Sequence, residues 1–221
     1  MRILLFLTVL LIPTALCAKE KIYTYGVDAR YDKNFGIILD FNNKAVTGQV
    51  RAYHENGNIM YVLPLKNGKL DGIFREYYES GKIYIEMQYK LGRAEGVSRT
   101  YYESGKVQEE AFNKDGEYDG VRRTYFENGK LWQETSYKSG KKEGISNFYY
   151  DTGEIKQELP YKEDILVGLG RYYLLNGAVV EFNYQNNNVV SGECINAAGE
   201  KTLLTDRQIT AFNSWKTVEC E

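Results

Sequence analysis

Apolar and polar residues alternate with a period of two over short runs, and these runs return every 24 residues. The clearest unit occupies residues 120–143 and reads GVRRTYFENGKLWQETSYKSGKKE. Two runs rich in β-branched and aromatic residues, joined by Asn-Gly, are typical of a β-hairpin. No unit carries the periodicity of a helix long enough for a crossover connection, so a parallel sheet is not expected.

Glycines mark the repeat. One series has a step of 24 throughout: Gly48, Gly72, Gly96, Gly120, Gly144, Gly168 and Gly192. A second series follows nine residues later: Gly57, Gly81, Gly105, Gly129, Gly153 and Gly177. A third series, Gly68, Gly92, Gly116 and Gly140, lapses to Asp164 and Asn188. The spacing predicts six units over residues 48–191, stacked as an all-β, elongated antiparallel meander of 24-residue hairpins.

The turn residues predict a register. Asn128-Gly129 favours a two-residue type I′ turn, because both central residues of that turn need positive φ. Counting outward places Phe126 opposite Leu131 and Tyr125 opposite Trp132. The count also pairs opposite charges in three units, which supports the register: Arg75 with Glu86, Arg99 with Glu110 and Arg123 with Glu134.

Alternation along the strands predicts two different faces. The arginine and the first tyrosine of each unit share a charged face. The second aromatic residue shares an apolar face with an aliphatic residue, in the pairs Tyr78 and Ile83, Tyr102 and Val107, and Phe126 and Leu131. In the unit at 96 the run from Lys106 to Phe112 is one residue short, which predicts a bulge or register adjustment there.

Both ends of the array are expected to be capped. Residues 19–47 contain two atypical runs, 21–26 and 35–41, which predict a divergent first hairpin. Residues 192–221 form the second cap, with a short helix over the last strand edge. Its apolar face comprises Leu204, Ile209, Phe212 and Trp215, and Thr205 is the expected N-cap.

Residues 1–18 have the pattern of a secretory signal peptide. Arg2 precedes the apolar run from Ile3 to Ile12, and cleavage is expected after Ala18. The run is too short to span a bilayer, so we expect an exported, periplasmic or extracellular protein without stable membrane insertion. A lipoprotein anchored through Cys17 is the alternative.

The remaining cysteines, Cys194 and Cys220, are an even pair in an exported chain, which predicts a disulfide. Two free buried thiols are the alternative. No CxxC spacing supports zinc binding or redox catalysis.

Catalytic and nucleic-acid functions find little support. The net charge is −2 and the charge runs are mixed in sign, so the basic stripe of a nucleic-acid binder is absent. His54 is the only histidine, and it replaces a repeated aromatic residue, so we expect packing rather than catalysis. The repeated glutamates face arginines, which makes them poor general acids. We expect no enzyme activity, no metal site and no cofactor.

The tyrosines of the charged face are the candidate binding residues. They are Tyr77, Tyr101, Tyr125, Tyr149 and Tyr173, flanked by Arg75, Arg99 and Arg123. Aromatic and arginine side chains dominate the binding energy of many interfaces, so this ladder suits a peptide, a glycan or a protein. The alternative is that each tyrosine only covers its neighbours within the sheet.

The segment YFENGKLWQETSYKSGKKEG resembles the bacterial variant of the MORN repeat (membrane occupation and recognition nexus), and the resemblance covers about residues 44–192. Three units depart from the pattern, at Val62, Asn147 and Phe182. The resemblance implies an all-β repeat sheet used for binding or scaffolding; some members are labelled antitoxin-like, and classical relatives are linked to membrane lipids.

We therefore expect an exported, non-enzymatic repeat protein that binds an unknown protein, a glycan or an envelope component through its sheet. An antitoxin-like or immunity protein that occludes a toxin is the alternative. A hydrolase or a lipid binder is a third hypothesis, and the balanced charge argues against anionic lipid.

Overall fold

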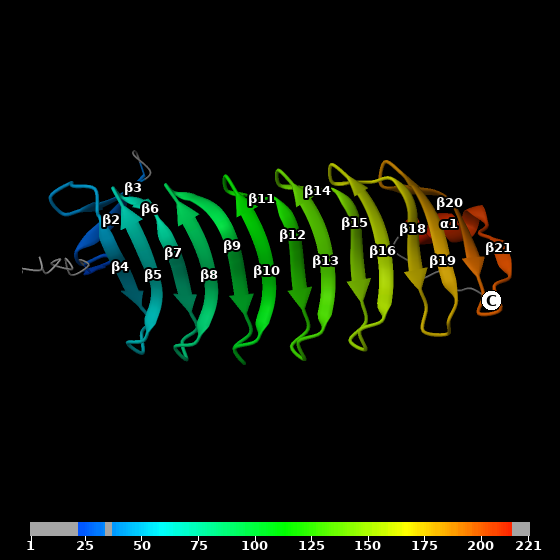
Figure 1. Ribbon diagram of the computed structural model, residues 1–221, viewed down its shortest axis with the longest axis horizontal. Coiled ribbons are helices and arrows are strands. Elements are labelled where there is room, and N and C mark those ends of the chain that lie inside the picture. Colours follow the sequence, from blue (N-terminus) through cyan, green and yellow to red (C-terminus); the bar gives the residue numbers. More distant parts are fainter. Residues whose placement is uncertain (1–21, 34–36, 214–221) are drawn as a thin grey trace, which may run out of the picture.

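A computed structural model describes residues 22–33 and 37–213 of the chain, and all but two of their strands form one long single-layered sheet (Figure 1). Every pairing along its length is antiparallel except that of β1 with β4, which is parallel. Strands follow one another in chain order, so the predicted meander of 24-residue hairpins is confirmed.

The first half of the sheet contains β1 (Ile22–Thr24), β4 (Gly48–Tyr53), β5 (Ile59–Lys66), β6 (Lys69–Leu70), β7 (Gly72–Tyr77), β8 (Ile83–Lys90), β9 (Arg93–Tyr101), β10 (Val107–Lys114) and β11 (Glu117–Tyr118). The second half contains β12 (Gly120–Tyr125), β13 (Leu131–Lys138), β14 (Lys141–Lys142), β15 (Gly144–Tyr149), β16 (Ile155–Lys162), β17 (Ile165–Leu166), β18 (Gly168–Tyr173), β19 (Val179–Gln185), β20 (Asn188–Ile195) and β21 (Lys201–Leu203). A separate hairpin pairs β2 (Ala29–Asp32) with β3 (Ile37–Asp40), and α1 spans Asp206–Asn213.

The type I′ turns lie between the units and not at the predicted Asn-Gly pairs. These upper turns, at the upper edge of the sheet in Figure 1, each have two central residues with positive φ. Their central pairs are Asn67-Gly68, Leu91-Gly92, Asp115-Gly116, Ser139-Gly140, Glu163-Asp164 and Asn186-Asn187. The last pair replaces the predicted Asn188, which begins β20.

The predicted two-residue turn at Asn128-Gly129 is wrong. Only Gly129 has positive φ, at 88°, and its N–H donates to Phe126 O at 2.8 Å. Phe126 N–H donates in turn to Lys130 O, so the loop has three residues and Tyr125 lies opposite Leu131. This is a type I turn closed by a glycine in the left-handed region. We call the equivalent turns of all units the lower turns.

The predicted arginine–glutamate pairs are nevertheless confirmed, because two one-residue shifts cancel. The three-residue loop moves the register by one, and a bulge at Trp132 moves it back, so Arg123 lies opposite Glu134. The same shift follows the lower turns of the units at 48, 72, 96 and 144. The bulge in the unit at 96 is therefore not peculiar to it: Asn113, opposite Gly96, takes the position of Tyr89, opposite Gly72.

The lower turns also link each unit to the next. The hydroxyl of Tyr78 donates to Tyr101 O at 2.6 Å, and Tyr102 and Tyr150 make the equivalent bond 23 residues on. His54 Nε2 bonds Tyr77 O at 2.9 Å in the same way, so His54 is a structural residue as expected. Lysines of the lower turns donate to carbonyls of the next turn as well. The repeated YYESGK-like motif is therefore a connector between hairpins.

Both caps cover the same side of the sheet, which we call the back face. At the N-terminal end Ala29 of β2 packs in a cluster with Tyr23, Val50 and Leu65. At the C-terminal end Ile209 of α1 packs on a cluster that includes Phe182 and Leu204. The predicted first hairpin was wrong, because β1 pairs with β4 and not with β3.

The C-terminal helix is confirmed, and Thr205 caps it: Gln208 N–H donates to Thr205 Oγ1, and Thr205 N–H donates to Gln208 Oε1. The helix packs on the back face at β20 rather than over the edge of the last strand, β21. Trp215, predicted to lie on its apolar face, is outside the described residues. The opposite face of the sheet carries neither cap.

Leu91 offers a test of the upper turns. Its φ is 51° and its side chain is 64% exposed, so it occupies a strained backbone position without compensating burial. Replacement by asparagine, which tolerates this region, should raise the free energy of unfolding by about 0.5 to 1 kcal/mol. The control Leu175→Asn changes another exposed leucine, 77% exposed, whose φ is not positive. Equal melting temperatures for the two variants would contradict the turn assignment.

Candidate binding face

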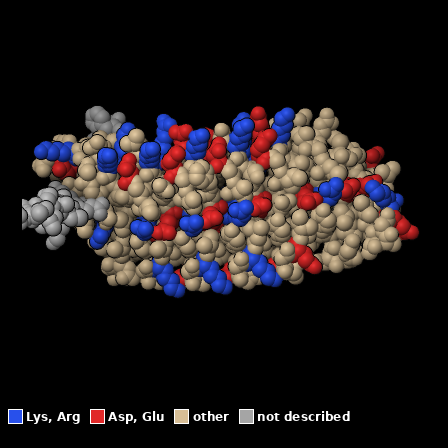
Figure 2. Space-filling model, in the orientation of Figure 1, with Lys and Arg blue, Asp and Glu red and all other residues tan. Residues whose placement is uncertain are grey.

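The face opposite the caps, which we call the front face, carries a line of alternating basic and acidic side chains across the middle of the strands (Figure 2). Arg75 pairs with Glu86 at 2.7 Å, and the next two units repeat the pair at 2.6 Å. Glu86, Glu110 and Glu158 also lie opposite the arginine of the following unit, as Glu86 does with Arg99. We call this line the ion ladder; its members are Arg75, Glu86, Arg99, Glu110, Arg123, Glu134, Glu158, Arg171 and Glu181.

Hydrogen bonds within the ladder favour the charged forms of Glu86 and Arg99. Burial alone raises the pKa of Glu86, but hydrogen bonds from Arg75 and Tyr101 outweigh this effect and leave the pKa lowered. The hydrogen bond to Glu110 raises the pKa of Arg99. At neutral pH these groups are therefore ionised, and a carboxylate held in this way is a poor general acid.

One neutral residue, Asn147, interrupts the ladder, and another, Val62, separates its first member Arg75 from Arg51. Val62 lies between Arg51 and Arg75, where other units carry a glutamate. Asn147 lies between Glu134 and Glu158, where other units carry an arginine. Both were noted in the sequence as departures from the repeat pattern, and the register shows that each removes one charge from a continuous line.

The predicted tyrosine row lies on the front face beside the ladder, and all five of its tyrosines are partly buried. Tyr101 donates to Glu86 at 3.0 Å, and Tyr173 donates to Glu158 at 3.0 Å. Burial and these bonds raise the pKa of both hydroxyls. The front face thus brings together all the predicted site residues: Tyr77, Tyr101, Tyr125, Tyr149, Tyr173, Arg75, Arg99 and Arg123.

The assignment of the aliphatic residues to the opposite face was wrong. Ile83 lies directly opposite Tyr77, and Val107 and Leu131 lie opposite the tyrosines of their units. The three-residue loop and the bulge put these side chains on the front face, because each changes which side of the strand a residue points to.

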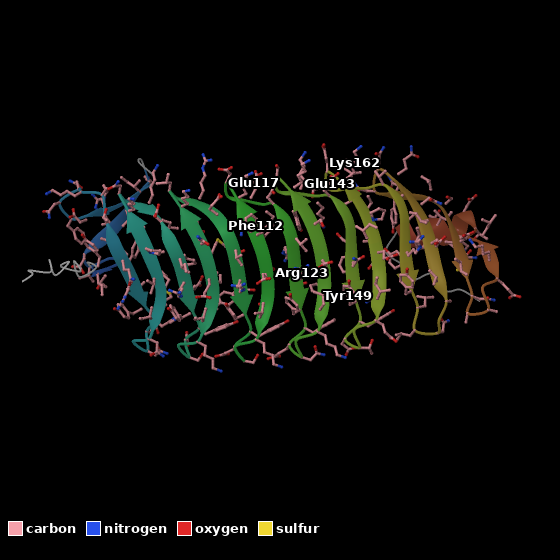
Figure 3. All side chains as sticks on the ribbon, in the orientation of Figure 1. Phe112, Glu117, Arg123, Glu143, Tyr149 and Lys162 are labelled. Atoms are coloured by element: carbon pink, nitrogen blue, oxygen red, sulfur yellow. The ribbon has the colours of Figure 1, made fainter. Side chains whose placement is uncertain are left out.

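An exposed apolar row on the other side of the ladder was missed from the sequence. Ile145 is 55% exposed, and the other residues of the row are between 37% and 46% exposed. Figure 3 shows Tyr149, Arg123 and Phe112 at successive heights along the strands, below the upper turns. The row comprises Ile73, Val97, Phe112, Val121, Ile145 and Leu169. Its signal in the sequence is the apolar residue that directly follows the glycine in the units at 72, 96, 120, 144 and 168; Phe112 joins the row because it lies opposite Val97.

In the middle of the back face, where neither cap lies, neighbouring side chains bond and cover one another. Arg122 forms a bidentate pair with Glu109, and Tyr118 also donates to Glu109. Small residues between the larger ones are almost fully covered, as Thr135 is at 1% exposure. The larger side chains of this face therefore cover the smaller ones, although they are themselves partly exposed.

The described residues contain no group of three or more His, Cys, Asp or Glu side chains arranged to hold a metal ion. The helix α1 is the only one in residues 22–33 and 37–213, and its eight residues are too few to cross a bilayer.

The predicted disulfide stays a prediction. Cys194 of β20 is 7% exposed in the C-terminal cluster of the back face. Its predicted partner Cys220 lies outside the described residues, as do Cys17 and the whole predicted signal peptide, residues 1–18.

The fold and the open front face define a class: a repeat protein of stacked β-hairpins that offers one long surface for binding. The family model described as MORN repeat variant matches five consecutive segments, at residues 46–67, 70–91, 94–115, 118–139 and 142–163. The chain belongs to the MORN-repeat proteins. Comparison with curated proteins gives no significant match.

MORN repeats are generally non-catalytic modules that bind proteins or membranes. The matched segments end before the hairpin of β18 and β19, which nevertheless continues the same sheet through the pairing of Glu158 with Arg171. Each matched segment ends at an upper turn, and each begins two residues before the glycine that was taken as the start of the unit.

Arg123 and Glu134 provide a test of the ladder. A double-mutant cycle with Arg123→Gln and Glu134→Gln should give a coupling free energy of about 0.5 to 1 kcal/mol, because the side chains are 41% and 30% exposed and solvent screens them in part. The control cycle, Arg93→Gln with Asp115→Asn, should give a coupling close to zero, since that pair is 3.4 Å apart and mostly exposed. Urea unfolding measures both; equal couplings would refute the special role of the ladder.

The lowered pKa of Glu86 predicts a pH dependence. A carboxylate with a depressed pKa in the folded state contributes stability above its unfolded pKa of about 4.3, and this contribution is lost as the pH falls through the folded pKa. Glu86→Gln should therefore be less stable than the parent at neutral pH, and the difference should shrink in acid. The Arg75→Gln background should weaken this pH dependence. A difference that stays constant from pH 7 to about pH 3 would rule out the ion pair as its cause.

Proposed function

We propose that this MORN-repeat protein is an exported, non-enzymatic binding module that holds a protein partner along its front face and acts in scaffolding. The exposed apolar row beside the ion ladder carries the proposal. Exposed apolar side chains recur along this row, with Gln88, Ser136 and Asn183 on the strands between them. Exposed apolar patches of this kind are characteristic of interaction sites. The caps pack only on the back face among the described residues, which leaves the front accessible.

A protein partner fits this face better than an anionic membrane does. The ion ladder has paired charges. Basic residues of the upper turns pair with acids of the next unit, as Arg93 does with Asp115 and Lys141 with Glu163. Attraction to an anionic surface needs an excess of basic residues, whereas the whole chain has a net charge of −2. An apolar stripe next to fixed ion pairs supplies both contact area and orientation to a protein.

Partner capture with matched variants tests the proposal. The full chain is exported and crosslinked in its own cell envelope, and the proteins bound to it are quantified. Ile145→Glu should reduce the recovery of a specific partner at least fivefold, because it places a charge in the apolar row. Leu91→Glu, the same kind of change on an exposed upper turn, should leave recovery unchanged. An antitoxin-like role would use the same face, and the captured protein would then be a toxin.

Two results would contradict the proposal. The first is a set of bound proteins that does not change with Ile145→Glu, since binding would then use another surface. The second is co-sedimentation of the parent protein, but not of Ile145→Glu, with vesicles of anionic lipid, since the front face would then bind a membrane.

A further inference from the structure

We propose that the interruption of the ion ladder at Asn147 is the point at which the front face receives an arginine side chain of its protein partner. This inference rests on the proposed function and adds the chemistry of the partner. The occupant is a protein segment that presents one arginine flanked by apolar side chains.

The regular units of the molecule show how an arginine side chain is held between two glutamates of the ladder. Arg99 of β9 lies between Glu86 of β8 and Glu110 of β10, and it bonds Glu110 at 2.6 Å. In β15 Asn147 has the same register between Glu134 and Glu158. Neighbouring strands lie about 4.8 Å apart, so the two carboxylates flank the asparagine as Glu86 and Glu110 flank Arg99. A guanidinium brought from outside can occupy the equivalent place.

The charges around Asn147 do not balance. From Arg123 to Glu181 the ladder holds two arginines, Arg123 and Arg171, and three glutamates, Glu134, Glu158 and Glu181. Arg171 forms ion pairs with two of these glutamates, with Glu181 at 2.7 Å and with Glu158 at 3.3 Å. One cation is therefore missing at this point of the line. Arginine suits the gap better than lysine, since its planar fork can bond two carboxylates at once.

The apolar row is most open at the same place. Ile145 lies two residues before Asn147 on the same strand and face, and at 55% it is the most exposed member of the row. Pro160 of β16 lies directly opposite Ile145, and Val121 of β12 and Leu169 of β18 lie one strand further away on either side. A partner arginine placed over Asn147 would thus have apolar neighbours that cover this stretch of the row, which excludes water from the new ion pairs and strengthens them.

Peptide titration with the full chain tests the inference. The probes are two short peptides, identical except that one has arginine and the other has the neutral isostere citrulline between two valines. In nuclear magnetic resonance titrations, the arginine peptide should shift the amide signals of Ile145 and Asn147 and bind at least fivefold more tightly than the citrulline peptide.

Variants locate the binding. Asn147→Arg completes the ladder from within and should weaken binding of the arginine peptide at least fivefold, without lowering the melting temperature. Thr152→Arg adds the same charge at the exposed lower turn of the same unit and should leave binding unchanged. Glu158→Gln, which removes one of the flanking carboxylates, should reduce the preference for arginine over citrulline.

Three outcomes would overturn the inference. Equal binding of the two peptides at Ile145 would leave protein binding by the front face intact but reject the arginine site. Unchanged binding to Asn147→Arg would place the site elsewhere, and absence of shifts with both peptides would reject it outright. A dimer of the parent chain that Asn147→Arg dissociates, measured by sedimentation velocity, would make a second copy the occupant. The proposed function fails separately, through the capture experiment with Ile145→Glu.

Discussion

Five of the six hairpins reverse through a three-residue lower turn and have a bulge just beyond it that offsets the extra residue. The hairpin of β18 and β19 lacks this bulge, so Glu181 and not Phe182 lies opposite Arg171. Because the two shifts cancel, a residue in one unit lies beside its counterpart in the next, and identical side chains line up across the strands. Ladders of ions, tyrosines and aliphatic residues follow from that alignment. A single uncompensated shift would send every later side chain to the opposite face.

Without a second layer, the sheet relies on contacts between neighbouring hairpins. Tyr78 and Lys82 donate to carbonyls of the next unit, and the ion ladder joins consecutive strands across the front. Stability in such an array is close to a sum over units and their interfaces. The caps add a second layer only at the two ends, and both lie on the back face. The front face is thus open for binding along its length.

Residues that depart from the repeat pattern distinguish one unit of the sheet from the others. Every regular unit has an arginine at the position of Asn147, so regular units offer a partner only charges that are already paired. A neutral residue between two glutamates, beside the most exposed residue of the apolar row, distinguishes one place on an otherwise uniform surface. A long repetitive face with one such irregularity can fix the register of a bound segment.

The sequence by itself determined the fold class, the 24-residue period, the short C-terminal helix with Thr205 as its cap, and the pairing of Arg123 with Glu134. These features depend on local patterns: glycine spacing, alternation and capping. Only the tertiary structure decided the turn types and the faces, because Asn128-Gly129 fits both a two-residue and a three-residue loop. The choice between the two loops depends on the bulge at Trp132. Because this bulge offsets the longer loop, the 24-residue period is the same with either loop and does not reveal which one forms. The exposed apolar row could not be predicted from the sequence either, because only the strand register and the position of the caps in the structure show which residues remain exposed.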